Sequence, residues 1–357
     1  MKRIIILAII LVVFLFSCSK NEKNYTVSEI NGIKLFCNKN IPSDSTFKIT
    51  PKELYTIELN ENNPDTALSN IGVRNLCIDK NKNVYMLDTR RAMVHKVDSR
   101  GKYVTSFGNK GTGPGEMNMP LNIAVMSDTL YVFDYAERKT NIFDLDGKFI
   151  RADFIASNAF FYSISGVNDE CFTGILALDR YGDEGVYTVY QVPIYKRNST
   201  PYKELYNREE ILQPPNDRFF PASFQPSYAV GHNKIYLLEN SQDTYKISVF
   251  DPEGVNLYNI RKNYRKLKMK EIDVEEHGEF GLKFLDILKF KNVSDQFGLH
   301  VTKDDYLLVK KSIERTEENK YDYIVDAFKD GVFINSFNLG IGKAYDYSYG
   351  LHKRWFL

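Results

Sequence analysis

Apolar and polar residues alternate along this chain in short runs that predict β-strands. Residues 186–192 alternate strictly, and residues 235–238 form a short apolar segment between polar turns. A period of two is typical of half-buried strands, and short apolar runs bounded by turn residues are typical of buried strands. Helical spacing is scarce, with Phe280, Phe284 and Leu288 as its best example. The pattern therefore predicts an all-β fold.

A repeat organises these strands. Residues 75–107 and 121–154 both contain an apolar strand, a polar turn, the motif Tyr-x-x-Asp, a second turn, a strand that ends in Asp, and a last strand. The motif tyrosines, Tyr85 and Tyr131, lie 46 residues apart, which is close to the period of a four-stranded propeller blade. Three weaker copies follow, at residues 162–206, 228–261 and 297–337.

An Asp-x-x-Gly turn precedes the last strand of three repeats. The aspartates can accept backbone hydrogen bonds inside a tight turn, and the glycines supply the positive φ that closes a hairpin. We therefore assign these repeated aspartates a structural role rather than a metal site. The turns are Asp98 to Gly101, Asp144 to Gly147 and Asp251 to Gly254.

Five repeats leave a ring to be closed. Residues 33–36, 47–49 and 54–59 are strand-like, and residues 345–357 are rich in aromatic side chains. A sixth blade built from both ends of the chain would leave no sheet edge unpaired. The predicted fold is a six-bladed β-propeller with four-stranded antiparallel blades, formed as a single domain by residues 25–357.

The first residues predict an export signal. Lys2 and Arg3 precede an unbroken apolar run, residues 4–16, which is too short for a permanent transmembrane helix. The following Leu-x-Ser-Cys sequence resembles a bacterial lipobox, which implies cleavage after residue 17 and diacylation of Cys18. An ordinary signal peptide is the alternative. By the same resemblance Ser19 implies the outer membrane of a Gram-negative cell, periplasmic or surface-facing, with residues 18–24 as a tether.

The loop at residues 107–120, FGNKGTGPGEMNMP, carries a family resemblance. It is similar to the Gly-rich loop of the NHL repeat, with Met117 where that family usually has Phe. The match covers about 80 residues, from 75 to 154. Together with the lipobox, the chain resembles the six-bladed β-propeller lipoproteins of Gram-negative bacteria. That resemblance implies a fold more firmly than a function.

Composition and charge narrow the function classes. The chain is 43% hydrophobic and 26% charged, which excludes a disordered protein. It holds 47 Lys and Arg against 46 Asp and Glu, and removing residues 1–17 leaves 45 against 46. This balance disfavours nucleic acid as a partner, because nucleic-acid binding relies on excess positive charge.

Three cysteines remain after Cys18, namely Cys37, Cys77 and Cys171. An odd number cannot be fully paired, and none has metal-ligand or CxxC spacing. We expect small buried apolar residues. A single disulfide, Cys37 to Cys77, is the alternative in an oxidising compartment.

The long connections all fall on one predicted face. In a propeller, turns after the second strand and connections between blades share a face, and here those connections include residues 108–120, 206–227 and 262–296. Long connections are typical of functional loops, so this face is the candidate binding surface. The candidate ligand-binding residues are Arg74, Arg90, Arg91, Arg138 and Lys139, of which the last four follow second strands.

The longest connection, residues 262–296, begins with five basic residues followed by five acidic ones. We interpret it as a solvated, self-neutralising excursion with a short helix near residues 280–290. A lid over the central opening and a nucleic-acid contact are the alternatives.

No catalytic motif is present. The chain lacks GxSxG, HExxH, Walker and CxxC sequences, and no cofactor is predicted. His232 and His300 lie near inner strands but not at matching positions, so they are weak metal candidates. The favoured function is a lipid-anchored module that binds a glycan, peptide or protein. The alternative is a metal-assisted hydrolase or lyase, which similar propellers imply, with a divalent ion at the channel mouth.

Overall fold

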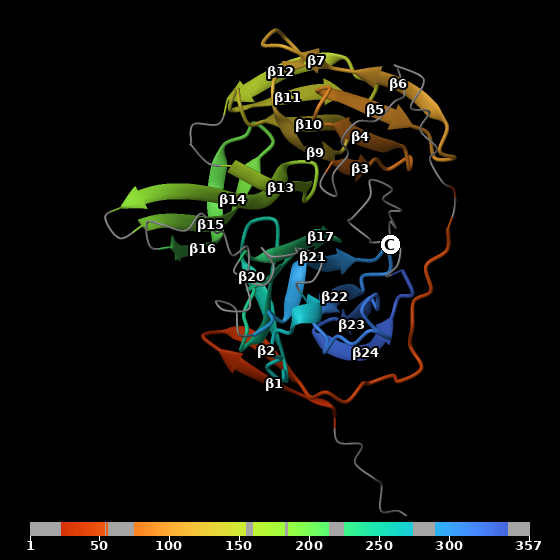
Figure 1. Cartoon of the computed structure of the whole chain (residues 1–357), viewed down its shortest axis with the longest axis vertical. Helices are drawn as coiled ribbons and strands as arrows, with labels where there is room; N and C mark the ends of the chain where they lie inside the picture. Colours follow the sequence, from red (N-terminus) through yellow and green to blue (C-terminus); the bar gives the residue numbers. More distant parts are fainter. Residues whose placement is uncertain are drawn as a thin grey trace, which may run out of the picture.

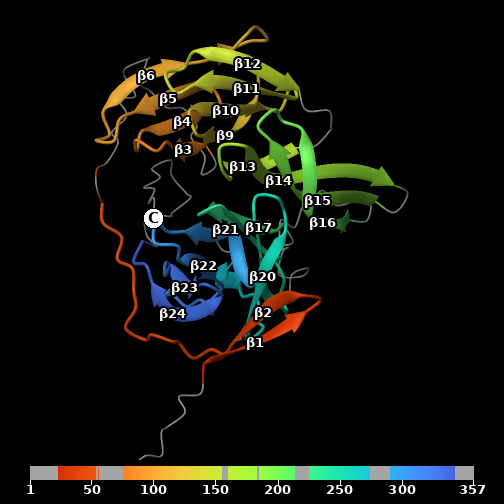
Figure 2. The same cartoon turned by 180° about the vertical axis from the view of Figure 1, so that it is seen from behind.

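The computed structural model describes residues 23–53, 55, 75–154, 160–182, 185–213, 225–273 and 290–341. Five sheets of four consecutive antiparallel strands follow one another along these residues. Figures 1 and 2 show them side by side around one axis, with the first strand of each sheet nearest the axis. We number these sheets blades 1 to 5 in chain order. The prediction of an all-β fold made of four-stranded blades is confirmed.

The strands of each blade are joined by hairpins. Blade 1 contains β3 (Leu76–Ile78), β4 (Val84–Asp88), β5 (Met93–Val97) and β6 (Tyr103–Phe107). Blade 2 contains β9 (Pro120–Met126), β10 (Thr129–Asp134), β11 (Lys139–Asp144) and β12 (Phe149–Phe154). Blade 3 contains β13 (Phe160–Gly166), β14 (Cys171–Gly182), β15 (Gly185–Lys196) and β16 (Pro201–Gln213).

Blades 4 and 5 complete the series. Blade 4 contains β17 (Ser227–Gly231), β18 (Lys234–Leu238), β19 (Tyr245–Phe250) and β20 (Asn256–Lys262). Blade 5 contains β21 (Ser294–Val301), β22 (Leu307–Lys311), β23 (Ile324–Lys329) and β24 (Val332–Asn338). Helix is scarce in the described residues, where a short 3-10 helix, η2, spans Glu271–Asp273. None of the helix found there has the length and apolar character to cross a membrane.

The Asp-x-x-Gly turns are structural, as predicted. Asp98 Oδ1 accepts hydrogen bonds from the backbone N–H groups of Arg100 and Lys102, each at 2.9 Å. The equivalent aspartate of blade 2, Asp144, holds its own turn in the same way. Gly147 closes that turn with a φ of +91°, which residues with a side chain rarely adopt.

The repeated tyrosine ties each of several blades to the next. The Tyr85 hydroxyl donates to the Leu145 carbonyl of blade 2 at 3.0 Å, and the Tyr236 hydroxyl donates to Asp305 of blade 5 at 3.1 Å. Burial and the neighbouring Asp79 raise the pKa of Tyr85, so its hydroxyl keeps its proton and remains a donor. The repeat in the sequence therefore encodes the junction between blades.

The apolar core lies in layers between neighbouring blades. Leu87 and Val132 pack between blades 1 and 2, and Val249 and Phe328 pack between blades 4 and 5. These side chains are at most 1% exposed. Burying each one stabilises the fold by about 1.5–3 kcal/mol relative to exposure. Each layer needs two blades, so the blades stabilise one another rather than folding singly.

The N-terminal hairpin lies elsewhere than expected. β1 (Tyr25–Ile30) and β2 (Ile33–Asn38) form a hairpin, and β2 pairs in parallel with β20, which makes the sheet of blade 4 six-stranded. The assignment of residues 33–36 to a ring-closing blade is therefore wrong. The outer strand of blade 4 otherwise presents an unpaired edge, and the hairpin covers it.

The structure describes only part of the other segments that were predicted to close the ring. Residues 47–49 form no strand, and the Phe47 ring instead stacks on Tyr306 of blade 5 with ring centroids 4.5 Å apart. Leu54, residues 56–59 and residues 345–357 lie outside the described residues. Which segments build the sixth blade therefore remains a prediction.

Tyr55 supports closure through the N-terminal segment. A Cβ atom on Gly101 of blade 1 would lie 2.6 Å from the Tyr55 ring. Equivalent glycines are covered by the outer strand that precedes their blade, as Phe107 of β6 covers Gly147 of blade 2. Tyr55 thus occupies over blade 1 the position that a preceding outer strand occupies over blade 2.

The three described cysteines are free. Cys171 is buried, and Cys37 and Cys77 are half-buried. Cys37 lies on β2 at the rim and Cys77 on β3 near the axis, so the strands hold the two thiols apart. The alternative of a disulfide between Cys37 and Cys77 is wrong, and the interpretation as free, largely buried residues holds.

Candidate functional site

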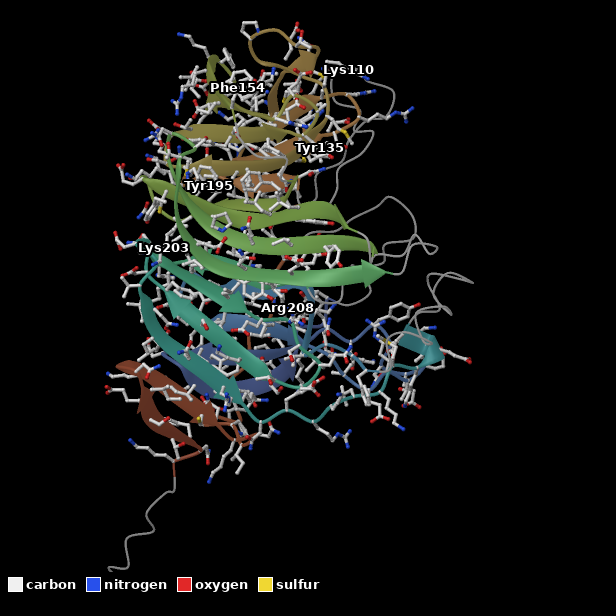
Figure 3. All side chains as sticks on the ribbon, turned by 90° about the vertical axis from the view of Figure 1, so that its left-hand side faces the viewer. Lys110, Tyr135, Phe154, Tyr195, Lys203 and Arg208 are labelled. Atoms are coloured by element: carbon white, nitrogen blue, oxygen red, sulfur yellow. The ribbon has the colours of Figure 1, made fainter. Side chains whose placement is uncertain are left out.

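The connections fall on two sides of the propeller, as predicted. Tyr135, in the turn after β10, donates its backbone N–H to Met119, in the connection before β9. Val293, between blades 4 and 5, donates likewise to Ser241, in the turn after β18. Turns after second strands and connections between blades therefore share a side, which we call the insertion-rich face. Figure 3 shows Tyr135 toward the side of η2, and Lys203 toward the opposite side.

The Gly-rich connection before blade 2 is held in one shape. β7 (Asn109–Lys110) pairs in parallel with β8 (Glu116–Met117). The Glu116 carboxylate accepts the backbone N–H of Gly113 at 2.8 Å. A Cβ atom on Gly111 would lie 2.8 Å from the carboxyl carbon of Glu116, so a side chain at this position would displace the Glu116 carboxylate. The loop is a preformed projection on the insertion-rich face.

A fully buried carboxylate fixes the end of this loop. Asp134, the last residue of β10, accepts the backbone N–H groups of Asn118 at 2.6 Å and Met119 at 3.0 Å. It also accepts that of Glu137 at 3.4 Å. Backbone donors satisfy a buried carboxylate and hold the loop against the turn after β10. The backbone of both segments is therefore fixed.

Lys139 is a buried cation at the start of β11. Its exposed fraction is 4%, and within the described part of the chain its ammonium makes no hydrogen bond or ion pair. It lies opposite Asp134 in the β10–β11 register, but that carboxylate is engaged by backbone groups. Arg138, just before it, is exposed with a φ of +50°. Both cations are placed on the insertion-rich face, as predicted.

Exposed apolar side chains lie on the segments next to these two cations. Met119, Tyr135 and Phe154 are 47%, 44% and 76% exposed. Met119 and Tyr135 are joined by a backbone hydrogen bond, and Phe154 is the register partner of Lys139. We call Met119, Tyr135, Arg138, Lys139 and Phe154 the blade 2 corner. Two cations here adjoin three exposed apolar side chains at one edge of the insertion-rich face.

The other cations predicted to bind a ligand are not part of the blade 2 corner. Arg90 is exposed and Arg91 half-buried, in the turn after β4, on the insertion-rich face. The backbone N–H groups of both are held by Asp88 Oδ1, at 3.1 and 3.0 Å. They lie on blade 1, outside the blade 2 corner. Arg74 lies outside the described residues.

The two histidines are not brought together as a metal site. His232 is exposed in the turn after β17 with Nε2 3.1 Å from the Thr302 carbonyl, and His300 lies on β21 with Nε2 3.3 Å from the Tyr323 hydroxyl. No group of three or more His, Cys, Asp or Glu side chains capable of holding a metal occurs among the described residues. Their contacts assign both histidines a structural role.

His300 is expected to make the fold sensitive to acid. Burial, and then the nearby Lys310 ammonium, lower its pKa from 6.5 to about 4. The unfolded chain binds the proton first, so stability is lost as the pH falls from about 6.5 to about 4, by about 2–3 kcal/mol for this half-buried ring. Urea midpoints measured across this range should decline less steeply in His300→Gln than in the wild type.

The exposed His232 supplies the control. We expect His232→Gln to keep the acid-dependent decline of the wild type. A His300→Gln variant with an unchanged slope would contradict the assignment, whatever its stability at pH 7.

The longest connection is anchored rather than solvated at its base. Lys262 Nζ lies 3.0 Å from Asp326 of blade 5, with both side chains buried, and Lys266 Nζ lies 2.6 Å from Asp243 of blade 4. Near the end of the connection, buried Lys291 pairs with Asp273. The interpretation as a solvated, self-neutralising excursion is wrong for Lys262 and Lys291, whose side chains are buried. Lys266 is exposed, as that interpretation expects, but its carboxylate partner lies outside the connection.

The two ends of this connection lie side by side. Lys268 forms an isolated bridge with Phe290, and the Lys291 N–H donates to the Leu267 carbonyl at 2.9 Å. Lys266 Nζ also lies 4.1 Å from the centre of the Phe290 ring. The predicted helix near residues 280–290 and the proposed lid fall on residues 274–289, outside the described residues.

Blade 3 extends beyond its neighbours on the insertion-rich face. β13 pairs with β14 only as far as Ala177, whereas β14 continues for five residues to Gly182 and pairs there with β15. β16 runs alongside to Gln213. Figure 3 shows these strands reaching toward the side of η2. They form a raised edge next to blade 2.

The sequence did not reveal the apolar part of the blade 2 corner. Tyr131 belongs to the repeat and is 2% exposed, whereas Tyr135 lies outside the repeat motif and is 44% exposed. Tyr135 follows the strand-ending Asp134, and that position in the turn was the available signal.

A comparison with protein families supports the fold. A family model described as a 6-bladed beta-propeller matches residues 57–168. No curated protein matches the chain. Similar solved structures include a protein described as exported from Bacteroides fragilis NCTC 9343, with 13% identity and a TM-score of 0.43 over 87% of this chain and 82% of that one.

Two further structures are similar at the same level. A virginiamycin B lyase from Staphylococcus aureus has 12% identity and a TM-score of 0.38 over 75% of this chain and 70% of its own. A nidogen/laminin complex has 11% identity and a TM-score of 0.38 over 73% of this chain and 78% of its own. Likenesses of this strength say nothing about a ligand. The family match and the sequential four-stranded sheets identify the chain as a six-bladed β-propeller, with blades 1 to 5 formed by described residues.

Proposed function

We propose that the chain is a lipid-anchored, extracytoplasmic binding module that holds an anionic partner at the blade 2 corner. The observation that carries this proposal is Lys139, whose ammonium has no anionic partner among the described residues although its side chain is buried. A buried cation is unfavourable unless an anion compensates it. An anionic group of a ligand would supply that compensation, with exposed Arg138 as a second contact.

The apolar side chains of the corner suit the same role. Aromatic residues, methionine and arginine are enriched at protein interfaces and among the residues that dominate binding energy. Tyr135, Met119 and Arg138 bring these types together. Asp134 fixes the backbone around them, so little conformational entropy remains to be lost on binding.

The extracytoplasmic location and the anchor are supported by the sequence alone. The basic start, the short apolar run and the lipobox-like ending at Cys18 are typical of an exported lipoprotein. A partner in the cell envelope, whether a glycan, a peptide or a protein, is consistent with that location.

The double variant Arg138→Gln/Lys139→Gln is expected to bind anionic ligands about 10–100-fold more weakly. Each charge-assisted hydrogen bond to the ligand contributes about 1.5–3 kcal/mol, from which the cost of removing the charged group from water is subtracted. The probes are acidic peptides and uronic-acid oligosaccharides, each with a neutral counterpart, measured by calorimetry at two salt concentrations. Binding by the wild type should favour the acidic probes and weaken at high salt.

Lys203→Gln is the matched control, because this exposed lysine lies on the opposite face (Figure 3). It should bind like the wild type. Equal affinity of the double variant and the wild type for the preferred probe would refute the blade 2 corner as the site. No preference for acidic over neutral probes would refute an anionic partner.

A further inference from the structure

An exposed apolar row crosses the rim of blade 4. The register pairs Ile30 of β1 with Ile33 of β2, and it pairs Lys34 of β2 with Tyr258 of β20, so that Ile33 and Leu257 each come one residue before that second pair. Ile30 and Leu257 are 56% and 41% exposed, and Val255, just before β20, is 58% exposed. Register partners lie on the same side of a sheet, and side chains two residues apart on a strand share a side. Ile30, Ile33 and Leu257 therefore lie on one side of this sheet, and we call them and Val255 the apolar strip.

Exposed lysines lie on the same hairpin as this strip. Lys23, Lys34 and Lys39 are all exposed, whereas Glu29 is the only acidic residue between positions 23 and 39. Apolar side chains next to several cations are the combination that favours the surface of an anionic bilayer. Tyr25, whose ring lies 5.8 Å from Lys23 Nζ, adds an aromatic residue of the kind found at membrane interfaces.

The position of the hairpin in the chain indicates which surface it meets. Six residues, 19–24, separate Cys18 from Tyr25 at the start of β1, and six extended residues span at most about 20 Å. A lipid on Cys18 would therefore hold the start of β1 within that distance of the bilayer. Figure 1 shows the hairpin at the lower rim, at the end of the molecule opposite blades 1 and 2.

We propose that the β1–β2 hairpin and the adjoining start of β20 form a lipid-contacting rim. The rim of the propeller then contacts the bilayer. The propeller axis lies parallel to the membrane surface, and the blade 2 corner is held away from the membrane. This inference rests on the lipid anchor of the proposed function, and the two are tested separately below. A second copy of the chain, pairing edge to edge along β1, is the competing occupant.

The test places a single tryptophan at the rim. Ile30→Trp is compared with Phe154→Trp, at the far end, both in a Trp355→Phe background because Trp355 is the chain's only tryptophan. The chain from Ser19 carries an N-terminal histidine tag and is held on phosphatidylglycerol vesicles by nickel-chelating lipid. Lipids with brominated acyl chains then quench whichever tryptophan reaches the bilayer.

We expect the emission of Ile30→Trp to shift to the blue and to be quenched several-fold more than that of Phe154→Trp. Equal, weak quenching at both positions would overturn the rim. So would a dimer of the chain from Ser19 in sedimentation velocity that Ile30→Asn dissociates, because β1 would then be occupied by a second copy.

The lipid anchor is tested by a different readout. Full-length protein purified from bacterial membranes should sediment with vesicles, and Cys18→Ser should not. If both remain soluble while tagged Ile30→Trp is quenched, the anchor fails and the rim stands. If full-length protein sediments while quenching is equal at both tryptophans, the anchor stands and the rim fails.

Discussion

Replacing Asp326 with asparagine is expected to lower the free energy of unfolding by about 3–5 kcal/mol. The carboxylate is fully buried on β23, with Lys262 Nζ at 3.0 Å and Lys311 Nζ at 3.5 Å. Burial lowers the pKa of Lys262, and Asp326 opposes that effect. Without the carboxylate, a charged lysine remains uncompensated between blades 4 and 5. The urea midpoint, followed by circular dichroism, measures the loss.

Two further variants show whether the charge is the cause. Glu314→Gln removes the exposed ion pairs with Arg265 and Lys270 and should leave the urea midpoint nearly unchanged, since solvent screens such pairs. The double variant Lys262→Met/Asp326→Leu should recover much of the stability lost in Asp326→Asn, because it removes both buried charges. A wild-type midpoint for Asp326→Asn would contradict this account.

Replacing Gly147 with valine is expected to lower the free energy of unfolding by about 3–4 kcal/mol. The residue has a φ of +91°, where a branched side chain is strained. Its Cβ would also lie 2.5 Å from Cγ and 3.0 Å from Cβ of Phe107, which packs on Phe143. The Phe107 ring cannot swing aside when its own Cβ is that close. Thermal and urea unfolding measure the effect.

The variant Gly32→Val separates the effect of backbone strain from that of steric crowding. Gly32 has a φ of +79°, but no atom lies within 4 Å of its potential Cβ. Only the backbone strain applies there, so we expect a loss of about 1–2 kcal/mol. Equal losses at the two glycines would show that the contact between blades 1 and 2 adds nothing.

The blades could be predicted because their signals are local. The tyrosines of the repeat and the Asp-x-x-Gly turns define hairpins from a few neighbouring residues, and the structure forms them in that register. Even the divergent third repeat, recognised from the alternation in residues 186–192, forms the complete blade 3. Periodicity and turn chemistry suffice where strands pair with their sequence neighbours.

Partners far apart in the sequence could not be predicted in the same way. The strand at residues 33–36 was identifiable, but its pairing with β20 depends on an edge more than 200 residues away. Similarly, Lys262 reads as a surface lysine until folding places Asp326 beside it. Strand propensity and charge do not specify which distant group completes the contact.

The cations of the candidate site could be predicted from the sequence, but its exposed apolar residues could not. Topology alone placed Arg138 and Lys139 on the insertion-rich face, because both follow a second strand. It did not show that Lys139 is buried, nor that Tyr135 and Phe154 are exposed, since aromatic residues follow the same pattern in the core. Exposure at strand ends depends on how the neighbouring loop folds, here through Asp134.

The raised edge of blade 3 limits the shape of any ligand at the blade 2 corner. Five extra residues of strand correspond to about 16 Å. A broad, rigid ligand surface that approaches the insertion-rich face would contact this raised edge before it reached Tyr135. A slender, pliable segment could pass in front of the ridge and lie along the corner. For the site that we propose, this geometry therefore favours extended, chain-like ligands over flat ones.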